Sequence, residues 1–595
     1  MKKFFTYLLA TITGVILVNL FFFILFFAII AGIGSMSFQK ASVAIKSNSI
    51  LELSFDETIT DRESGNPLET FDPFSFSHHS TLGLNTLLKK INAAASDDRI
   101  SGIYLNLQDI DGGLSTVEEV RAALLEFKKS GKFIYSYSNL GYSQTSYYLA
   151  TTADSLFINP NASLLLTGLS ATVAYYKDML QKFGVSPEVV RVGKFKSAVE
   201  PFLDNKMSEA NREQLSVYLN SRWANIVKGI ADGRKIPAER VNRLTDEFRF
   251  YSPEEFVKEG LFDAAIWEDQ MVQKLKTACN VEEEEELNLV SIADYSQVTW
   301  PDKNVKNHKI AVIYALGEIG MKQATFSIGP ELALTIREAR RDTTVKAIVL
   351  RVNSPGGSAS TSDIIWREVE LAARVKPVIA SMGNVAASGG YYIACAADTI
   401  IADPTTITGS IGVFGIFFSG EKLIRETIGI HPEVVTTHRH GDFGGSYPLP
   451  LPLASRGLTP YERQVLQMYV NNTYTTFLDR VSQGRGMTPE AVNEIGQGRV
   501  WTGEDALRIG LVDMLGGLEQ AIALAAEKAG LTTYQLQELP AAVNFWQILL
   551  EEFPAAVKQR VVKAELGELY PLYEQQKRLL TTRGILARLP VEFSL

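Results

Sequence analysis

Short apolar runs alternate with amphipathic stretches over most of the 595 residues. The runs at 347–352 and 377–381 are largely apolar, as is typical of strands in a sheet that is covered on both faces. The stretches at 362–375 and 386–397 have the spacing of helices. This alternation predicts parallel strands joined by crossover helices, and therefore an α/β fold.

One apolar segment is different in kind. No charged residue lies between Lys3 and Lys40, and residues 4–34 are almost entirely apolar. About 20 apolar residues span a bilayer, whereas a cleavable signal peptide has an apolar region of roughly 7–15. We therefore expect a transmembrane anchor at 4–34, with Lys2 and Lys3 on the cytoplasmic side and the rest of the chain exported. The alternative is a long signal peptide that is cut between residues 31 and 37.

The chain also repeats itself with a period far longer than that of a solenoid. Six segments recur in the same order, at an offset close to 245 residues in the best-aligned parts. Such an ordered series indicates two copies of one α/β domain. The matched pairs are 50–53 with 310–313, 99–105 with 344–350, 115–116 with 360–361, 147–160 with 391–404, 187–190 with 432–435, and 251–263 with 501–513.

The repeat defines the expected domains. The copies occupy 48–280 and 309–530, and a linker at 281–308 between them contains five consecutive glutamates. A glutamate run of this kind is usually solvated. Residues 531–595 have no repeat partner in the sequence, and we expect them to form a helical extension.

Composition excludes several functions. The net charge of −9, without a basic stripe, argues against nucleic-acid binding. Two cysteines are too few for a disulfide framework, and no Cys/His spacing indicates a metal site. We expect no cofactor. The residues weighed for these roles are Cys279 and Cys395, predicted as buried free thiols, and His78, His79, His438 and His440, predicted in solvated loops.

The differences between the copies point to the chemistry. In the second copy the strand at 377–381 leads to Ser388, which has small residues on both sides and precedes a helix. Small neighbours let the backbone turn sharply and expose the hydroxyl, and a helix N-terminus favours a developing alkoxide. A helix N-cap is the alternative role for this serine. The first copy has Gln144 at the aligned position.

Paired glycines follow the preceding strand of the second copy. Gly356 and Gly357 come after the run at 347–352, and the first copy keeps a weaker version at 111–113. Glycines there let backbone N–H groups approach an oxyanion, so both residues are oxyanion-hole candidates. A plain turn is the alternative.

No histidine is placed to serve Ser388, but the first copy offers a lysine. Lys196 aligns with Gly441, so one copy has the serine without the lysine and the other the lysine without the serine. A lysine base must be neutral, and only about 0.04% would be so at pH 7 with an unperturbed pKa. Burial lowers the pKa of a lysine. Lys194 is an equal competitor on local sequence, and Ser410 is a candidate to orient the amine.

At four places the chain resembles the signal peptide peptidase A family in its long, duplicated form (protease IV). The matching segments are 195–202, 354–358, 386–391 and 408–412, and the similarity runs from the anchor through Gly516. The resemblance implies two tandem domains similar to crotonase and Clp protease folds, assembled as a homotetramer. It implies Ser388 as nucleophile, Lys196 as base and Ser410 as the hydrogen-bond partner of Lys196. It also excludes Lys194 as the base.

The same resemblance implies a serine endopeptidase of the bacterial inner membrane. Its catalytic domains would lie on the periplasmic side, and its substrates would be hydrophobic peptides such as signal peptide remnants. Two rival interpretations stay open at this point. One is a crotonase-like acyl-CoA enzyme, which would use paired N–H groups as an oxyanion hole and need an acidic base. The other is a non-catalytic membrane scaffold that binds peptides.

Overall fold

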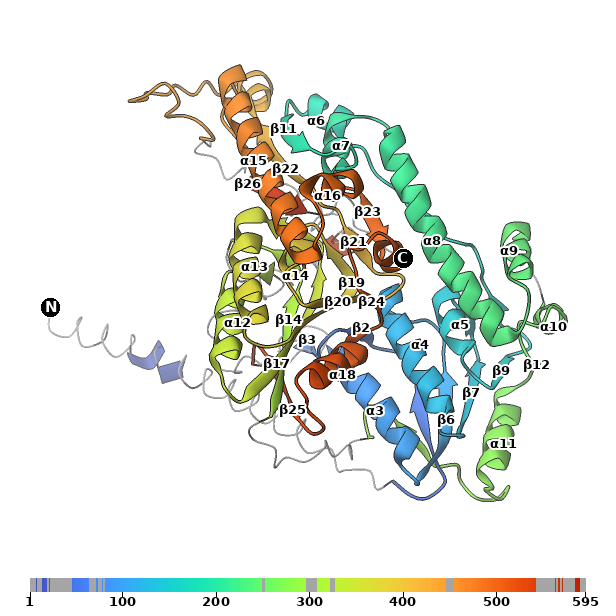
Figure 1. Ribbon diagram of the computed structural model, residues 1–595. Helices are drawn as coiled ribbons and strands as arrows, with labels where there is room; N and C mark the ends of the chain where they lie inside the picture. Colours follow the sequence, from blue (N-terminus) through green and yellow to red (C-terminus); the bar gives the residue numbers. More distant parts are fainter. Residues whose placement is uncertain are drawn as a thin grey trace.

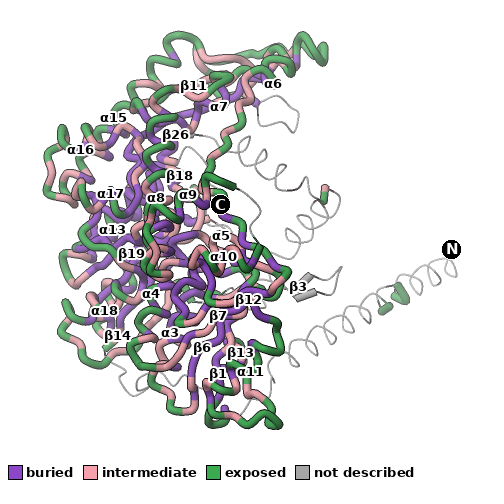
Figure 2. Tube along the Cα trace, turned by 90° about the vertical axis from the view of Figure 1, so that its right-hand side faces the viewer, coloured by how far each residue is buried: buried purple, intermediate pink, exposed green. Residues whose placement is uncertain are grey.

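The computed structural model describes most of the chain between residues 45 and 541 (Figure 1). Its N-terminal half and its C-terminal half form two α/β units that lie side by side. In both halves the strands form a buried interior and the outer helix faces are exposed (Figure 2). The described ranges are 45–63, 71–72, 77–78, 81–248, 252–295, 308–321, 327–445, 453–541 and 584–588, with isolated residues at 7, 13–15, 17–18, 21, 562, 566–567 and 570.

The first half is built on a six-stranded sheet in the order β12-β9-β7-β6-β1-β13, with every neighbouring pair parallel. Its strands are short and the central ones are mostly buried, as a sheet covered on both faces requires. They span Ser49–Leu53 (β1), Ile100–Asn106 (β6), Phe133–Ser138 (β7), Ser155–Ile158 (β9), Ala264–Ala265 (β12) and Leu289–Ser291 (β13).

The second half repeats this sheet strand for strand, in the order β24-β20-β19-β17-β14-β25 and again all parallel. Two further strands, β21 and β23, extend it beside β19. The duplication read from the sequence is therefore a duplication of topology. The strands span Lys309–Leu316 (β14), Val345–Ser354 (β17), Val378–Ala387 (β19), Thr399–Ala402 (β20), Ile407–Gly409 (β21), Val500–Thr502 (β23), Met514–Leu515 (β24) and Gln535–Leu539 (β25).

The helices repeat as well. Each half ends in a 26-residue helix followed by three shorter ones. Serine or threonine side chains cap both long helices, at Ser208 and Thr459, as the usual N-cap preference predicts. The two sets are α3 (Leu84–Ser96), α4 (Leu114–Lys128), α5 (Gln144–Ala150), α8 (Glu209–Arg234), α9 (Ala238–Glu247), α10 (Pro253–Lys258) and α11 (Glu268–Cys279), against α12 (Glu331–Arg341), α13 (Ala359–Ala373), α14 (Gly389–Ala394), α15 (Pro460–Arg485), α16 (Pro489–Ile495), α17 (Gly503–Arg508) and α18 (Leu518–Lys528).

A third sheet joins the halves, in the order β11-β22-β26-β18-β15-β16. The first half supplies β11, which pairs antiparallel with β22 of the second half from Ser186 opposite Ser419 to Val192 opposite Val413. This sheet places the chain after β11 beside the second half (Figure 1). Its strands are Ser186–Val192 (β11), Glu318–Ile319 (β15), Ser327–Ile328 (β16), Gly356–Ser358 (β18), Val413–Ser419 (β22) and Gly584–Arg588 (β26).

Three expectations from the sequence differ from the structure. The helix expected from residue 386 begins at Gly389, because β19 continues to Ala387 by pairing with β17 and β21. The linker at 281–308 contains β13, which pairs with β1 of the first half. Within 531–595, expected to be helical, the described strands β25 and β26 pair with sheets of the second half.

The expected membrane anchor at 4–34 lies almost wholly outside the described residues. Within the part of the chain that is described, no helix is both long enough and apolar enough to cross a bilayer.

Candidate active site

Ser388 lies on a sharp turn between a strand and a helix. It follows β19 directly and precedes α14, with φ 55° and ψ −112°. Positive φ is uncommon for a residue with a side chain and costs of order 1–3 kcal/mol unless the surroundings enforce it. Here its N–H donates to Gly409 O at 2.8 Å. A strained strand-to-helix turn is the arrangement that presents a nucleophilic serine.

The Ser388 side chain does not cap α14, so the N-cap interpretation is wrong for its hydroxyl. Its Oγ lies 2.9 Å from Lys196 Nζ and 3.4 Å from Gly412 O. Lys196 Nζ also lies 3.1 Å from Ser410 Oγ and 3.2 Å from Ser410 O. The structure thus brings together the three residues that the sequence singled out from two different copies.

The third sheet explains how Lys196 reaches this position. Lys196 comes four residues after the end of β11, which is paired along its whole length with β22 of the second half. The chain then packs against the second half, where Phe195 N–H donates to Gln497 O at 2.9 Å. Gly498, at φ +81°, lies so close that a Cβ there would be 2.7 Å from Lys196 Cα. Only a glycine fits at this contact.

Burial sets the charge of the lysine. Lys196, Ser388 and Ser410 are all fully buried. Burial lowers the pKa of Lys196 well below its usual value, and no acidic side chain contributes to this shift. The Phe414 ring lies 6.0 Å from Nζ. An amine with hydroxyl, carbonyl and aromatic neighbours is therefore favoured in its neutral form.

The structure separates the two candidate lysines. Lys194 is exposed and its Nζ lies 5.0 Å from the Phe195 ring. Because it lies at the surface, it is not placed to contact the buried Ser388 hydroxyl.

The paired glycines lie beside Ser388. Gly356 and Gly357 form the start of β18 with φ +93° and +154°, which a side chain would not adopt without strain. A Cβ on Gly389, the residue after Ser388, would lie 3.1 Å from Gly356 Cα. The Gly356 N–H donates to Ser354 Oγ at 3.2 Å. Gly357 lies opposite Ile319 of β15 and Ala587 of β26.

A strand from the C-terminal region lies against the same turn. β26 pairs antiparallel with β18, with Gly357 opposite Ala587, and on its other edge with β22. A side chain on Gly356 would collide with Ala587 O. An extended segment thus fits between the two strands that border the Ser388 turn.

The equivalent place in the first half has no such chemistry. Gln144 begins α5, and its Oε1 accepts hydrogen bonds from the N–H groups of Thr167 and Gly168. The aligned Gly441 lies in an exposed stretch of the second half. Neither position contributes a nucleophile or a base.

Sequence reasoning missed the contacts that hold the lysine loop. Gln214, on α8, donates to Phe195 O at 3.1 Å and to Ser197 Oγ at 3.0 Å, and its own Oε1 accepts from Val500 N–H at 3.4 Å. A glutamine on a long helix carries no local signal of this role. The glycines at 496 and 498 offered a weak one, since paired glycines often mark a close backbone approach.

The described residues contain no group of three or more His, Cys, Asp or Glu side chains arranged to hold a metal ion. Cys279 and Cys395 are free and buried, as predicted. Burial raises the pKa of both thiols, to about 11 and about 12, so neither is a reactive thiolate at neutral pH.

An α/β protein with a buried serine on a strained turn, next to a buried lysine, has the arrangement of a hydrolase that acts by nucleophilic attack. The peptidase family S49 model matches the chain twice, at residues 126–282 and 370–532. The chain therefore belongs to peptidase family S49, and it is a serine protease. Because the chain belongs to this family of proteases, we discard the two rival interpretations, an acyl-CoA enzyme and a non-catalytic scaffold.

Named relatives support the same assignment. The chain is 36% identical to "Serine protease SPPA, chloroplastic" of Arabidopsis thaliana over 468 residues, which are 77% of this chain and 68% of that protein. It is 34% identical to "Protease 4" of Haemophilus influenzae over 583 residues, 93% of this chain and 91% of that protein. Among solved structures, a mutant of ClpP1 from Listeria monocytogenes is 14% identical, with 37% of this chain and 97% of that chain covered, at a TM-score of 0.23.

Proposed function

We propose that this chain is a membrane-anchored endopeptidase that cleaves hydrophobic peptides with a Ser388–Lys196 dyad. The observation that carries the proposal is the 2.9 Å separation of Lys196 Nζ and Ser388 Oγ in a fully buried site. An acyl-transfer serine needs a base within hydrogen-bond reach, and no other titratable group contacts this hydroxyl in the described structure.

The contacts of the amine fit the role of a base. A neutral lysine has two N–H groups and one lone pair. The two N–H groups can donate to Ser410 Oγ and Ser410 O, which leaves the lone pair for the Ser388 hydroxyl. Ser410 would thus orient the base. Its own backbone is held at φ 50°, with its N–H donating to Arg499 O at 2.7 Å.

The reaction follows from this arrangement. Lys196 Nζ takes the proton of Ser388 as Oγ attacks the peptide carbonyl, and the protonated amine then gives this proton to the leaving amine. Water attacks the resulting ester, again with Lys196 as base. The Gly357 N–H would stabilise the oxyanion, because it belongs to the turn that lies against the residue after Ser388. Loss of one such donor costs a factor of about 10²–10³ in kcat.

An extended peptide is the substrate form that the groove favours. β26 already lies there as a strand between β18 and β22, with Leu586 and Ala587 buried. A substrate that took the place of β26 between these strands would gain main-chain hydrogen bonds irrespective of its sequence. The neighbouring aromatic rings of Phe414 and Phe418 are buried and suit apolar side chains. Hydrophobic peptides, including signal peptide remnants, match these features.

The apolar segment at 4–34 supports the cellular part of the proposal. It would anchor the protein in the bacterial inner membrane with both S49 domains on the periplasmic side. An enzyme held at the membrane surface would meet apolar peptides as they leave the bilayer.

The test is peptidase activity on a fluorogenic apolar peptide, together with labelling by a fluorophosphonate serine probe. We expect Ser388→Ala and Lys196→Ala to lose hydrolysis and probe labelling while remaining folded by circular dichroism. Lys194→Ala is the matched control, because it removes an exposed lysine from the same loop, and it should retain full activity. An active, folded Lys196→Ala protein would disprove the dyad.

We further propose that the chain self-associates head to tail, as expected for a homotetramer. Within the chain, β11 of the first half pairs with β22 of the second. The repeat partner of β11, residues 432–435, is exposed instead, with Val435 fully exposed. The first-half counterpart of β22, at 168–174 by the offset of 245, is in no strand. The same pairing between neighbouring chains would join these two segments, and repeating it would close a ring.

Disulfide trapping tests this contact. Val434→Cys combined with Ala171→Cys, the counterparts of the Val189–Ile416 pair, should form intermolecular disulfides that give a ladder of cross-linked species on a gel, since both native cysteines are buried. Val435→Asp should shift the protein to monomers in analytical ultracentrifugation. Cross-linking that is no stronger than for a pair of cysteines on α9 would refute the contact.

A further inference from the structure

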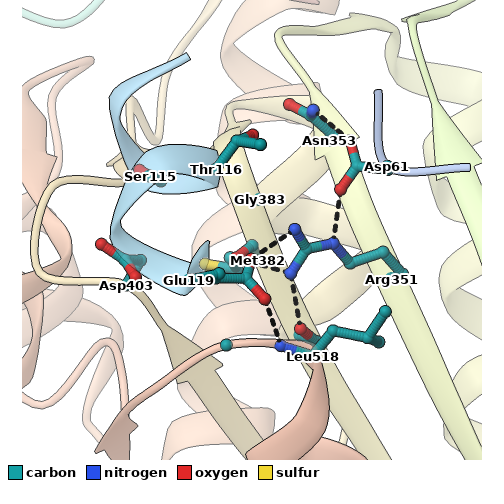
Figure 3. Close-up of polar contacts among 12 residues, drawn as sticks. Asp61, Ser115, Thr116, Glu119, Arg351, Asn353, Met382, Gly383, Asp403 and Leu518 are labelled. Carbon is teal, nitrogen blue, oxygen red and sulfur yellow. Dashed lines mark hydrogen bonds and ion pairs between the residues drawn. The ribbon is translucent and has the colours of Figure 1, made fainter. Parts of the chain in front are cut away.

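Arg351 is a fully buried cation in the centre of β17, five residues before Gly356. Its guanidinium is held on three sides. Nε donates to Asp61 Oδ1 at 2.6 Å, and one terminal nitrogen donates to Glu119 Oε1 at 2.6 Å (Figure 3). The other terminal nitrogen donates to Ser381 Oγ at 2.9 Å. We refer to Arg351, Asp61 and Glu119 as the seam cluster.

The two carboxylates of the seam cluster come from the other half of the chain. Asp61 directly follows β2 (Thr58–Thr60), and Glu119 lies on α4. Asp61 Oδ2 also accepts a hydrogen bond from Asn353 Nδ2, and Asn353 Oδ1 accepts one from Val385 N–H. The seam cluster therefore ties the first half to both strands that lead to the site, β17 toward Gly356 and β19 toward Ser388.

A second pair of contacts lies alongside. Thr116 N–H donates to Asn384 Oδ1 at 3.2 Å, and Asn384 Nδ2 donates to Thr116 Oγ1 at 2.8 Å. Asn384 is four residues before Ser388 on β19. Glu119 Oε2 accepts the N–H of Leu518 at the start of α18 at 2.6 Å (Figure 3). First-half side chains thus contact the second half on either side of its catalytic strands.

The repeat distinguishes this cluster from ordinary packing. The first-half counterpart of Arg351 is Asn106, which donates to Glu52 of its own half at 2.9 Å. The second-half counterpart of Glu119 is Ile364, which is half exposed. The arginine lies in the copy with the serine and the carboxylates lie in the copy with the lysine. This is the division already seen for Ser388 and Lys196.

Stability alone is a weak reason to keep such a cluster. Desolvating three charges is costly, and replacing a buried ion triad with apolar residues is often neutral or stabilising. The relative position of the two halves is a stronger reason, because Ser388 and Lys196 belong to different halves and their distance depends on that position. We propose that Arg351, with Asp61 and Glu119, positions the two halves so that Lys196 meets Ser388.

The charges around the cluster define how to test it. Burial raises the pKa of Glu119, and burial also raises the pKa of its neighbours Glu118 and Asp403. Removing Arg351 alone would leave Asp61 and Glu119 without their cation, and such a variant is at risk of failing to fold. The informative variant therefore neutralises all three side chains together: Arg351→Met, Asp61→Asn and Glu119→Gln.

The experiment compares this triple variant with Arg351→Lys and with a control in the full-length protein. Arg121→Met is the control, because Arg121 is a buried arginine on the same helix as Glu119 and its hydrogen-bond partners lie only in the first half. Folding is measured by circular dichroism, and kcat and KM are measured per folded molecule. An error of about 1 Å in a catalytic contact costs about 10²-fold. We expect kcat of the triple variant to fall by about 10²-fold, with KM within about threefold of wild type.

Two further readouts separate positioning from stability. Arg351→Lys keeps the charge without the fork and should recover part of kcat. In the triple variant the acid limb of the kcat/KM profile should move to higher pH, because water admitted between the halves weakens the desolvation of Lys196. This last readout rests on the proposed dyad, whereas the fall in kcat does not. Wild-type kcat in the folded triple variant, or an equal loss in Arg121→Met, would overturn the proposal.

Discussion

The two halves of the chain share their packing and differ in their chemistry. Tyr147 in one half and Tyr391 in the other donate to the backbone carbonyls of Leu261 and Leu511, both at 2.8 Å. Arg234 pairs with Asp263, and Arg485 pairs with Asp513, at the ends of the two long helices. The sheets have the same strand order. Contacts that hold each α/β unit together have therefore been kept in both copies.

The divergent positions lie where the halves meet. Ser388 replaces Gln144, Lys196 has Gly441 as its counterpart, and the lysine is carried across by β11. Each half lacks the residue that the other half supplies. The residues of the proposed dyad thus lie at positions where the two repeats differ.

The strongest test of this comparison changes the two aligned residues at the strand-to-helix turns. Ser388→Ala should lower kcat by at least about 10⁴-fold, because it removes the proposed nucleophile. Gln144→Ala should leave kcat within about threefold, since Gln144 contacts only its own half. Steady-state hydrolysis of the apolar peptide measures both. Equal losses would show that the halves are not chemically distinct.

Replacing Lys196 should give the next largest loss of kcat. Lys196→Met should lower kcat by about 10²–10⁴-fold, the usual contribution of a general base. In the wild type, kcat/KM should rise with pH through an inflection well below the usual lysine pKa of about 10.4, as the amine becomes neutral. An inflection near 10.4 would contradict a desolvated base.

The same variant should be more stable than the wild type. The pKa of Lys196 is lowered in the folded state, so the unfolded chain binds more protons between that pKa and about 10.4. Stability of the wild type therefore falls as the pH falls through this window, and a methionine removes the cost. We expect Lys196→Met to raise the melting temperature by a few degrees at pH 7, with a smaller gain at pH 9. A gain that does not change with pH would point to packing alone.

The shared tyrosines should respond alike. Tyr147→Phe and Tyr391→Phe each leave a buried carbonyl without its donor, at a cost of about 1–3 kcal/mol. Urea unfolding measures the loss, and kcat per folded molecule should be unchanged in both. A selective effect of Tyr391→Phe on kcat would extend the catalytic region beyond the divergent residues.

Breaking the ion pairs that both halves share, Arg234–Asp263 and Arg485–Asp513, should have the smallest effect. Asp263→Asn and Asp513→Asn leave the nearly buried Arg234 and Arg485 without a charged partner, although the new amide oxygen can still accept the backbone N–H of Leu156 or Ile400. We therefore expect each to cost about 1 kcal/mol of unfolding free energy, measured by urea unfolding. Added salt should change the difference from wild type only slightly, because partly buried pairs are weakly screened.

Much of the site could be predicted because its signals are local. A serine among small residues, a glycine pair after a strand and a lysine missing from one copy are each visible within a few positions. The structure brings Ser388, Lys196 and Ser410 into contact as expected. The helix boundary at Gly389 was missed because pairing with β17 and β21, not local propensity, extends β19 to Ala387.

The missed features depend on partners far away in the chain. β26 pairs with strands about 170 or more residues earlier, and nothing in its own five residues indicates this. Arg351 was visible as a charge in an apolar run, but its partners lie 232 and 290 residues away. A buried charge in a strand predicts that a partner exists, while only the fold shows which one.

The crossing of β11 onto β22 has a consequence for the nascent chain. When Ser388 is synthesised, Lys196 has been made, but β22 at 413–419 has not. The strand that delivers the lysine therefore has no edge to pair with until the ribosome has translated well past the nucleophile. The Ser388–Lys196 contact can form only after β22 is available to pair with β11, so we expect the enzyme to be inactive while its second half is still being synthesised.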